Sequence, residues 1–136
     1  MHSWLVRVYY EDTDAGGVVF YANYLKFFER GRTEWLRTLG FESQELLDRA
    51  NRVLVVRKVD IEYLAPARLD DELSIVTQVS RLGGSSIQFD QAAWRGQQPL
   101  AQGQITVVCV DTQSFKPARL DAAMRQAFNE NIKDTK

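Results

Sequence analysis

The chain has 136 residues, of which 45% are hydrophobic and 11% aromatic, and its 17 basic and 18 acidic side chains nearly cancel. A chain of this size and composition is one compact domain that needs no disulfide or metal to fold. The balanced charge, with no long run of one sign, argues against a protein built to bind nucleic acid. Because no apolar run approaches the roughly 18 residues of a membrane-spanning helix, we expect no transmembrane segment.

Histidine and cysteine each occur once, as His2 and Cys109. One cysteine cannot form an intramolecular disulfide, which favours a cytoplasmic location. A histidine close to the terminus and a cysteine inside an apolar strand form no ligand set for zinc, so we predict no metal and no cofactor. Catalytic centres built on histidine are disfavoured for the same reason. Acid–base chemistry then falls to carboxylates, tyrosine or lysine.

The N-terminal third predicts a strand, a loop and a helix. Apolar side chains alternate along residues 4–10, which is the period of a strand. Residues 22–39 place apolar side chains at spacings of three and four, which predicts a helix ended by Gly40. Gly31 falls in the apolar stripe of this helix, so we expect a sheet to pack closely there. A short helix over 43–49, capped by Ser43, follows.

The rest of the chain predicts strands and a closing helix. Four strands are expected at 52–63, 72–82, 86–94 and 100–110, in hairpin succession and with Gly83-Gly84 in a turn. A weak helix at 121–129 and a polar tail follow. No strand–helix alternation occurs, so we predict an α+β fold with an antiparallel sheet on one long helix. Both faces of several strands carry apolar residues, which predicts a second subunit on the outer face.

Asp14 is the first candidate for chemistry. It precedes the predicted helix, where a carboxylate meets free backbone N–H groups and the positive end of the helix dipole. It could cap the helix, or it could attack a carbonyl or activate water while helix N–H groups bind the oxyanion. The local pattern alone favours the cap, because Asp before a helix is common. Asp12 and Glu11 are weaker candidates, since they lie further from the helix.

Three other sets of side chains each allow a structural or a functional interpretation. Cys109 is expected to be a buried core thiol and not a nucleophile. Aromatic side chains could line an acyl pocket or simply pack on the sheet: Tyr9, Tyr10, Tyr21 and Tyr24. Basic side chains near strand ends could meet phosphates, although scattered surface charge is the favoured interpretation: Arg57, Lys58, Arg68, Arg81 and Lys116.

Two segments of the chain read VRVYYEDTDAGGVVFYANYLKFFERGRTEWL and VVRKVDIEYLAPARLDDELSI. Both resemble the YbgC-type acyl-CoA thioesterases, a hotdog-fold branch of the 4-hydroxybenzoyl-CoA thioesterase family. The similarity spans about residues 5–119. The run D-x-D-x-x-G-x-V-x-[FY]-x-x-Y is specific, and A-P-A-R-L-D-D is a second, independent match. With this resemblance we favour a catalytic role for Asp14 over a role as helix cap.

The resemblance implies a five-stranded antiparallel sheet wrapped around one long central helix, in a homodimer or homotetramer. The whole chain, 1–136, is then one hotdog domain, with a core of about 4–120 and a C-terminal tail of about 121–136. The implied reaction is hydrolysis of acyl-CoA thioesters without a metal. Asp14 is the implied nucleophile or general base, and the backbone N–H of Tyr21 is the implied oxyanion donor. Many YbgC-like chains carry His at the position of Tyr21, so any role of that imidazole is absent here.

The resemblance also implies a cytoplasmic enzyme of lipid metabolism associated with the Tol-Pal system. The carrier could be coenzyme A or acyl carrier protein, and the acyl group is open. An alternative is a non-catalytic hotdog protein that binds an acyl ligand or a partner and makes no use of Asp14. A hotdog dehydratase would need a catalytic histidine, and the chain offers only His2.

Overall fold

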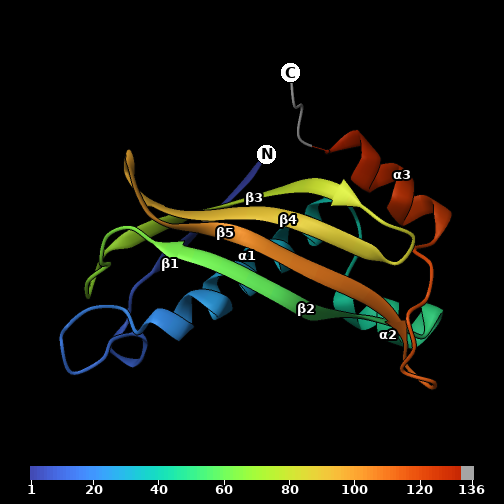
Figure 1. The fold of residues 1–136 in the computed structure, drawn as a ribbon, viewed down its shortest axis with the longest axis horizontal. Coiled ribbons are helices and arrows are strands. Elements are labelled where there is room, and N and C mark those ends of the chain that lie inside the picture. Colours follow the sequence, from blue (N-terminus) through green and yellow to red (C-terminus); the bar gives the residue numbers. More distant parts are fainter. Residues whose placement is uncertain (133–136) are drawn as a thin grey trace.

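The computed structural model describes residues 1–132. A strand comes first, then a loop and a long helix, and then four strands between two shorter helices (Figure 1). In chain order the elements are β1 (His2–Arg7), η1 (Tyr10–Asp12), η2 (Tyr21–Asn23), α1 (Tyr24–Thr38), α2 (Ser43–Ala50), β2 (Arg52–Tyr63), β3 (Glu72–Leu82), β4 (Ser86–Arg95), β5 (Gln98–Asp111) and α3 (Ala122–Glu130). The polar tail lies mostly outside the described residues.

One five-stranded antiparallel sheet, in the order β1-β3-β4-β5-β2, curves over α1. Figure 1 shows α1 behind the sheet, with the preceding loop at one end of the molecule and α2 and α3 at the other. Register shifts in the long strands, such as the one between Val56 and Lys58, let the sheet bend. The predicted α+β hotdog architecture is confirmed.

The predicted hairpin succession is wrong at one place. β3, β4 and β5 form a meander, but β2 pairs with β5 at the far edge of the sheet and not with β3. The connection at 64–71 therefore crosses from one side of the sheet to the other. Strand periodicity records which residues face the core, not which strands are neighbours, so the sequence pattern could not predict this crossing.

The core lies between α1 and the sheet. Phe27 and Phe28 of the helix are fully buried against it. A Cβ added at Gly31 would lie 2.8 Å from Cγ2 of Ile75 and 2.9 Å from Oγ1 of Thr77, both on β3. The predicted close packing of the sheet on Gly31 is thus confirmed. Glycine is needed there because the helix and β3 leave no room for a side chain.

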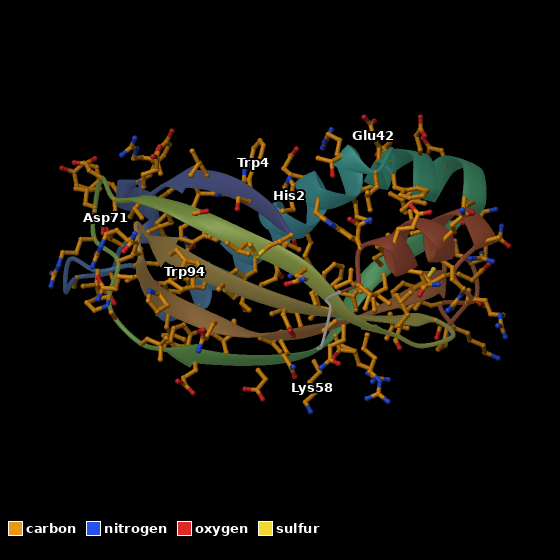
Figure 2. The ribbon with its side chains drawn as sticks, turned by 90° about the horizontal axis from the view of Figure 1, so that it is seen from above. His2, Trp4, Glu42, Lys58, Asp71 and Trp94 are labelled. Carbon is orange, nitrogen blue, oxygen red and sulfur yellow. The ribbon has the colours of Figure 1, made fainter. Side chains whose placement is uncertain are left out.

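The first strand starts earlier and ends earlier than predicted. His2 pairs with Thr77, and the chain leaves the ladder after Arg7. Tyr10 begins the 3-10 turn η1, so its side chain is 81% exposed and does not share the buried face of Val6 and Val8. Figure 2 shows His2 and Trp4 on this edge of the molecule and Lys58 of β2 on the opposite edge.

The helix α3 closes the end of the core that is remote from the loop. Asp121 caps it by accepting a hydrogen bond from the backbone N–H of Met124 at 2.8 Å. Met124 and Phe128 are buried, and the Phe128 ring centroid lies 5.2 Å from that of Trp35 on α1. The packed part of the chain therefore continues beyond residue 120. The short helix α2 begins at Ser43, but its N-cap residue is Glu42 and not Ser43.

Candidate active site

The loop before α1 folds back on itself as a short hairpin. The backbone N–H of Asp14 donates to the carbonyl of Val18 at 2.9 Å, and that of Phe20 donates to the carbonyl of Asp12 at 2.9 Å. Between the two arms, the chain turns through Asp14–Gly17, closed by a hydrogen bond from Gly17 N–H to the Asp14 carbonyl at 3.0 Å. Gly17 has a φ of +79°, which only glycine adopts at no steric cost.

Asp14 is exposed at this turn and does not cap the helix. Its Oδ1 accepts a hydrogen bond from the backbone N–H of Gly16 at 2.8 Å. The N-cap position of α1 is held by Asn23, whose side chain makes no capping hydrogen bond. Eight residues lie between Asp14 and Asn23, so the helix-cap interpretation of Asp14 is wrong. A Cβ on Gly16 would lie 3.2 Å from Asp14 Oδ1, so a glycine there leaves space for the carboxylate.

Asp12 has the opposite surroundings. Its side chain is buried, with 5% exposed. Oδ2 accepts a hydrogen bond from the backbone N–H of Tyr9 at 2.8 Å, and Oδ1 accepts one from Nδ2 of Asn23 at 2.7 Å. These two bonds tie the end of the first strand to the start of the helix. Asp12 therefore fixes the hairpin on which Asp14 is carried.

Tyr21 is the first residue of η2, the 3-10 turn that leads into α1. The first N–H groups of such a turn have no earlier carbonyl within it to bind. Within residues 1–132 the Tyr21 N–H donates no hydrogen bond. The carbonyl of the same residue accepts a hydrogen bond from the hydroxyl of Tyr63 at 3.0 Å. That carbonyl belongs to the following peptide unit. The unit that carries the Tyr21 N–H is held through its Phe20 carbonyl, which accepts a hydrogen bond from the Asn23 N–H at 2.8 Å, and the Tyr21 N–H is left free.

Asp14 and Tyr21 belong to the same hairpin but make no direct contact among the described hydrogen bonds. Asp14 lies beside the turn, opposite Val18, and Tyr21 follows the second arm. An unpartnered N–H and an exposed carboxylate are thereby carried on one short segment of the chain. The free N–H also lies at the positive end of α1, where negative charge is stabilised.

Three tyrosine rings pack together beside the start of α1. Tyr21, Tyr24 and Tyr63 line a hollow of about 320 Å³ together with Val19 and the start of the 64–71 connection. Burial raises the pKa of the Tyr24 hydroxyl. Tyr9 and Tyr10, which we grouped with Tyr21 and Tyr24 as candidates for an acyl pocket, line a different hollow. Tyr63 was missed because its approach to Tyr21 spans 42 residues of sequence and leaves no local pattern.

The A-P-A-R-L-D-D segment supports the hairpin from outside. Val19 N–H donates to the Ala67 carbonyl at 2.8 Å, which ties the second arm to this connection. Asp71, labelled at the loop end of the molecule in Figure 2, accepts hydrogen bonds from Arg95 Nη1 at 2.8 Å and from Arg68 N–H at 2.9 Å. Burial alone would raise the pKa of Asp71, but these hydrogen bonds and the two guanidinium charges lower it.

The other chemistry-bearing residues lie away from this hairpin. Cys109 is buried in β5, as predicted, and burial raises the pKa of its thiol. His2 lies at the start of β1, while the hairpin follows the other end of that strand. Burial lowers the pKa of His2. Across residues 1–132, no three His, Cys, Asp or Glu side chains converge on a metal position, and no helix is long and apolar enough to cross a membrane.

Comparison with known proteins places the chain in a family. Residues 16–102 match the model of the thioesterase superfamily. The acyl-CoA thioesterase YbgC of Haemophilus influenzae is 46% identical over 93% of both chains. The acyl-CoA thioester hydrolase YbgC of Escherichia coli O157:H7 is 47% identical, over 93% of this chain and 95% of the relative. A probable thioesterase from Bartonella henselae superposes with a TM-score of 0.85 and 37% identity, over 88% of this chain and 98% of that one. The chain belongs to the thioesterase superfamily and, within it, to the YbgC-type acyl-CoA thioesterases.

Proposed function

We propose that this protein hydrolyses acyl-CoA thioesters, with Asp14 as nucleophile or general base and the Tyr21 N–H as oxyanion donor. The observation that carries the proposal is the loop before α1, which presents an exposed carboxylate, whose Oδ2 accepts no hydrogen bond from residues 1–132, together with a free backbone N–H. The names of the relatives support acyl-CoA as the substrate class.

Two routes use the same two groups. As nucleophile, an Asp14 oxygen attacks the thioester carbon, the C–S bond breaks, and CoA leaves as the thiolate; water then hydrolyses the resulting anhydride and restores the carboxylate. As general base, Asp14 takes a proton from a water that attacks the same carbon. In both routes the thioester oxygen gains negative charge in the transition state. A donor fixed in advance, such as the Tyr21 N–H at the start of η2, stabilises that charge.

The assembly belongs to the same proposal. β2 is an edge strand of the sheet, and Val56, Val59 and Tyr63 on it are 47%, 40% and 46% exposed. An exposed apolar edge strand favours pairing with a second copy. We therefore propose a homodimer or homotetramer. A link with Tol-Pal and lipid metabolism, and acyl carrier protein as a carrier, rest on the resemblance alone, while a cytoplasmic location rests on the resemblance and on the single cysteine.

The test is a thiol-release assay on benzoyl-, butyryl- and palmitoyl-CoA, run beside equilibrium binding of the same compounds. The proposal predicts CoA release from at least one of the three and so also narrows the acyl group. Binding of all three without CoA release would instead support the non-catalytic hotdog protein.

A further inference from the structure

A second cavity lies beside the middle of α1, away from the Asp14 hairpin. It measures about 390 Å³, within the range that holds small organic ligands. Helices α1 and α2, the first half of β2, and one residue each of β4 and β5 form its walls. Most of the lining is aliphatic or aromatic, contributed by Leu36, Leu46, Leu47, Val53, Leu54, Val55, Val56, Phe89 and Val107.

Arg32 of α1 is a buried cation in this apolar wall. Only 9% of its surface is exposed. Its Nη1 donates to Oε1 of Gln91 at 3.0 Å, and Gln91 is held in turn by the Phe28 carbonyl at 2.9 Å and Thr77 Oγ1 at 2.8 Å. One edge of the guanidinium is therefore fixed to the sheet. Its Nε and Nη2 donate no hydrogen bond to residues 1–132, and Arg32 lines the cavity.

No carboxylate of the described chain neutralises this guanidinium. Every ion pair within 4.0 Å among residues 1–132 involves another cation. Glu29, one turn earlier on α1, also lines the cavity but is exposed and forms no such pair. Burial lowers the pKa of Arg32 to about 10, against a weaker opposing effect of Glu29, so the group is charged at neutral pH. Burying a charge without a partner is costly, and a bound anion would remove that cost.

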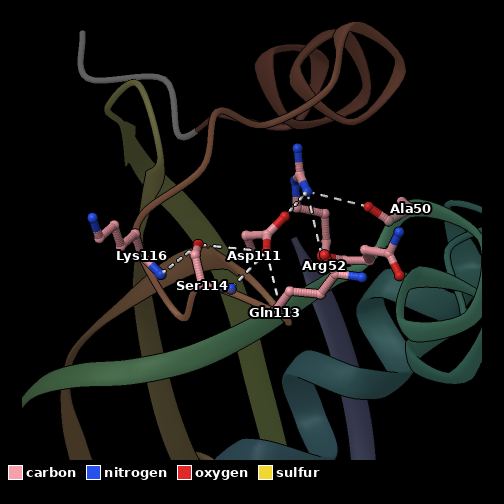
Figure 3. Close-up of polar contacts among 7 residues, drawn as sticks. Ala50, Arg52, Asp111, Gln113, Ser114 and Lys116 are labelled. Atoms are coloured by element: carbon pink, nitrogen blue, oxygen red, sulfur yellow. Dashed lines mark hydrogen bonds and ion pairs between the residues drawn. The ribbon is translucent and has the colours of Figure 1, made fainter.

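Arg52, the other arginine that lines the cavity, differs from Arg32 because it has a carboxylate partner. Its Nη1 lies 3.2 Å from Oδ2 of Asp111 and also donates to the carbonyls of Ala50 and Asn51 (Figure 3). Asp111 is itself held by N–H groups of the following turn. The Arg52 charge is therefore already paired with a carboxylate, whereas no ion pair among residues 1–132 contains Arg32.

We infer that this cavity binds a carboxylate carried on an apolar chain, with Arg32 as the anion-binding residue. The free Nε–H and Nη2–H form the edge that a carboxylate accepts in bidentate fashion, and the aliphatic wall takes the chain. Arg32 follows Tyr21 by eleven residues, about 16 Å along a helix. The site is thus distinct from the Asp14 hairpin, and the inference goes beyond the proposed function.

Two molecules carry this chemistry: a free fatty acid, or an acyl-CoA whose acyl chain ends in a second carboxylate. For the free acid, the probe is octanoate, titrated calorimetrically against the intact protein, with octanamide as the uncharged match of equal length. We expect octanoate to bind at least about tenfold more tightly than octanamide, the difference typical of hydrogen bonds to a charged group. Arg32→Gln is expected to remove this difference, Arg32→Lys to restore part of it, and Arg52→Gln to leave it within about twofold.

For the second source, kcat/KM is compared for tetradecanedioyl-CoA and tetradecanoyl-CoA, whose extended acyl chains are long enough to reach from Tyr21 to Arg32. A preference for tetradecanedioyl-CoA that Arg32→Gln abolishes would assign the carboxylate to the far end of the substrate. Equal binding of octanoate and octanamide together with no preference for tetradecanedioyl-CoA overturns the inference, as does full retention of either effect in Arg32→Gln. The comparison of octanoate with octanamide needs no variant, so it tests the preference for a carboxylate even if Arg32→Gln fails to fold. It also needs no turnover, so failure of the proposed hydrolysis would be seen separately.

Discussion

The hairpin before α1 carries two carboxylates, two positions apart, in opposite surroundings. Asp12 is 5% exposed and uses both oxygens, on Tyr9 N–H and on Asn23 Nδ2. Asp14 is exposed, uses Oδ1 on Gly16 N–H, and its Oδ2 accepts no hydrogen bond from the described chain. A carboxylate with all its partners supplied stabilises the fold, and one with an oxygen to spare can act on a substrate. The comparison therefore assigns stability to Asp12 and reactivity to Asp14.

The largest effect is expected from Asp14→Asn. The amide keeps the size of the side chain but is neither a nucleophile nor a base. We therefore expect kcat to fall by about 10³-fold or more, since general-base catalysis alone contributes about 10²- to 10⁴-fold. The midpoint of thermal unfolding should stay within about 2 °C, because an exposed side chain contributes little to stability. Steady-state thiol release and thermal unfolding on the same preparation measure both. A large loss of stability together with activity would break the contrast with Asp12.

Asp12→Asn should reverse this pattern. Asparagine offers one acceptor oxygen where Asp12 offers two, so either the partly buried Tyr9 N–H or the buried Asn23 Nδ2 loses its partner. Leaving a buried donor unsatisfied costs about 1–3 kcal/mol, which denaturant unfolding will register as a lower midpoint at unchanged slope. Below the unfolding transition, kcat should fall much less than in Asp14→Asn. Wild-type stability in this variant would mean that the two buried hydrogen bonds do not hold the hairpin.

The strands of the sheet show how far the sequence alone leads. The strand at 52–63 and the strand at 72–82 were predicted with their exact bounds, because a period of two and turn residues are local signals. The crossing of β2 to the edge of the sheet was not, since strand order depends on contacts remote in sequence. The prediction of close packing at Gly31 was correct. Glycine weakens a helix, so it is expected in an apolar helical stripe mainly where a neighbouring element leaves no room for a side chain.

The candidate site shows the same difference between local sequence signals, which were read correctly in part, and contacts between distant residues, which were missed. Asp14 stood out in the sequence through its motif and through the lack of rival groups, although its local geometry was misread as a cap. The anchoring role of Asp12, the hydroxyl of Tyr63 and the pairing of Arg32 with Gln91 did not stand out. Each depends on a partner 11 to 59 residues away. A buried arginine in an amphipathic helix looks, in sequence, like any solvent-facing charge.

Tyr63→Phe should have an intermediate effect on kcat. It tests whether β2 supports the turn η2, which carries the Tyr21 N–H. The variant keeps the ring that packs on Tyr21 and removes only the 3.0 Å hydrogen bond to its carbonyl. We expect kcat to fall roughly threefold to tenfold, with KM little changed, because a net hydrogen bond is worth about 0.5–1.5 kcal/mol. Steady-state kinetics measure the two constants separately. An unchanged kcat would show that the turn η2, which carries the Tyr21 N–H, needs no support from β2.

The smallest effect concerns the pH dependence of stability through Asp71. Its pKa is lower in the folded protein than the ordinary 3.8, so its charged form stabilises the fold above that pH. This contribution is lost as the pH falls below 3.8 and through the folded pKa. Asp71→Asn should therefore show a shallower decline of unfolding free energy from pH 5 to pH 3 than the wild type, measured by urea unfolding. Parallel curves would mean that the Arg95 and Arg68 contacts do not favour the charged form.

The most direct measurement of the division between Asp14 and Asp12 is single-turnover hydrolysis with enzyme in excess over an acyl-CoA that the wild type cleaves. Rapid quenching isolates the chemical step from product release, and a parallel titration measures binding. Asp14→Asn should bind the acyl-CoA as the wild type does and return it intact, with the chemical step slowed by about 10³-fold, while folded Asp12→Asn should stay within about tenfold of the wild type. Cleavage by Asp14→Asn at a rate close to that of the wild type would contradict the assignment of the chemistry to Asp14.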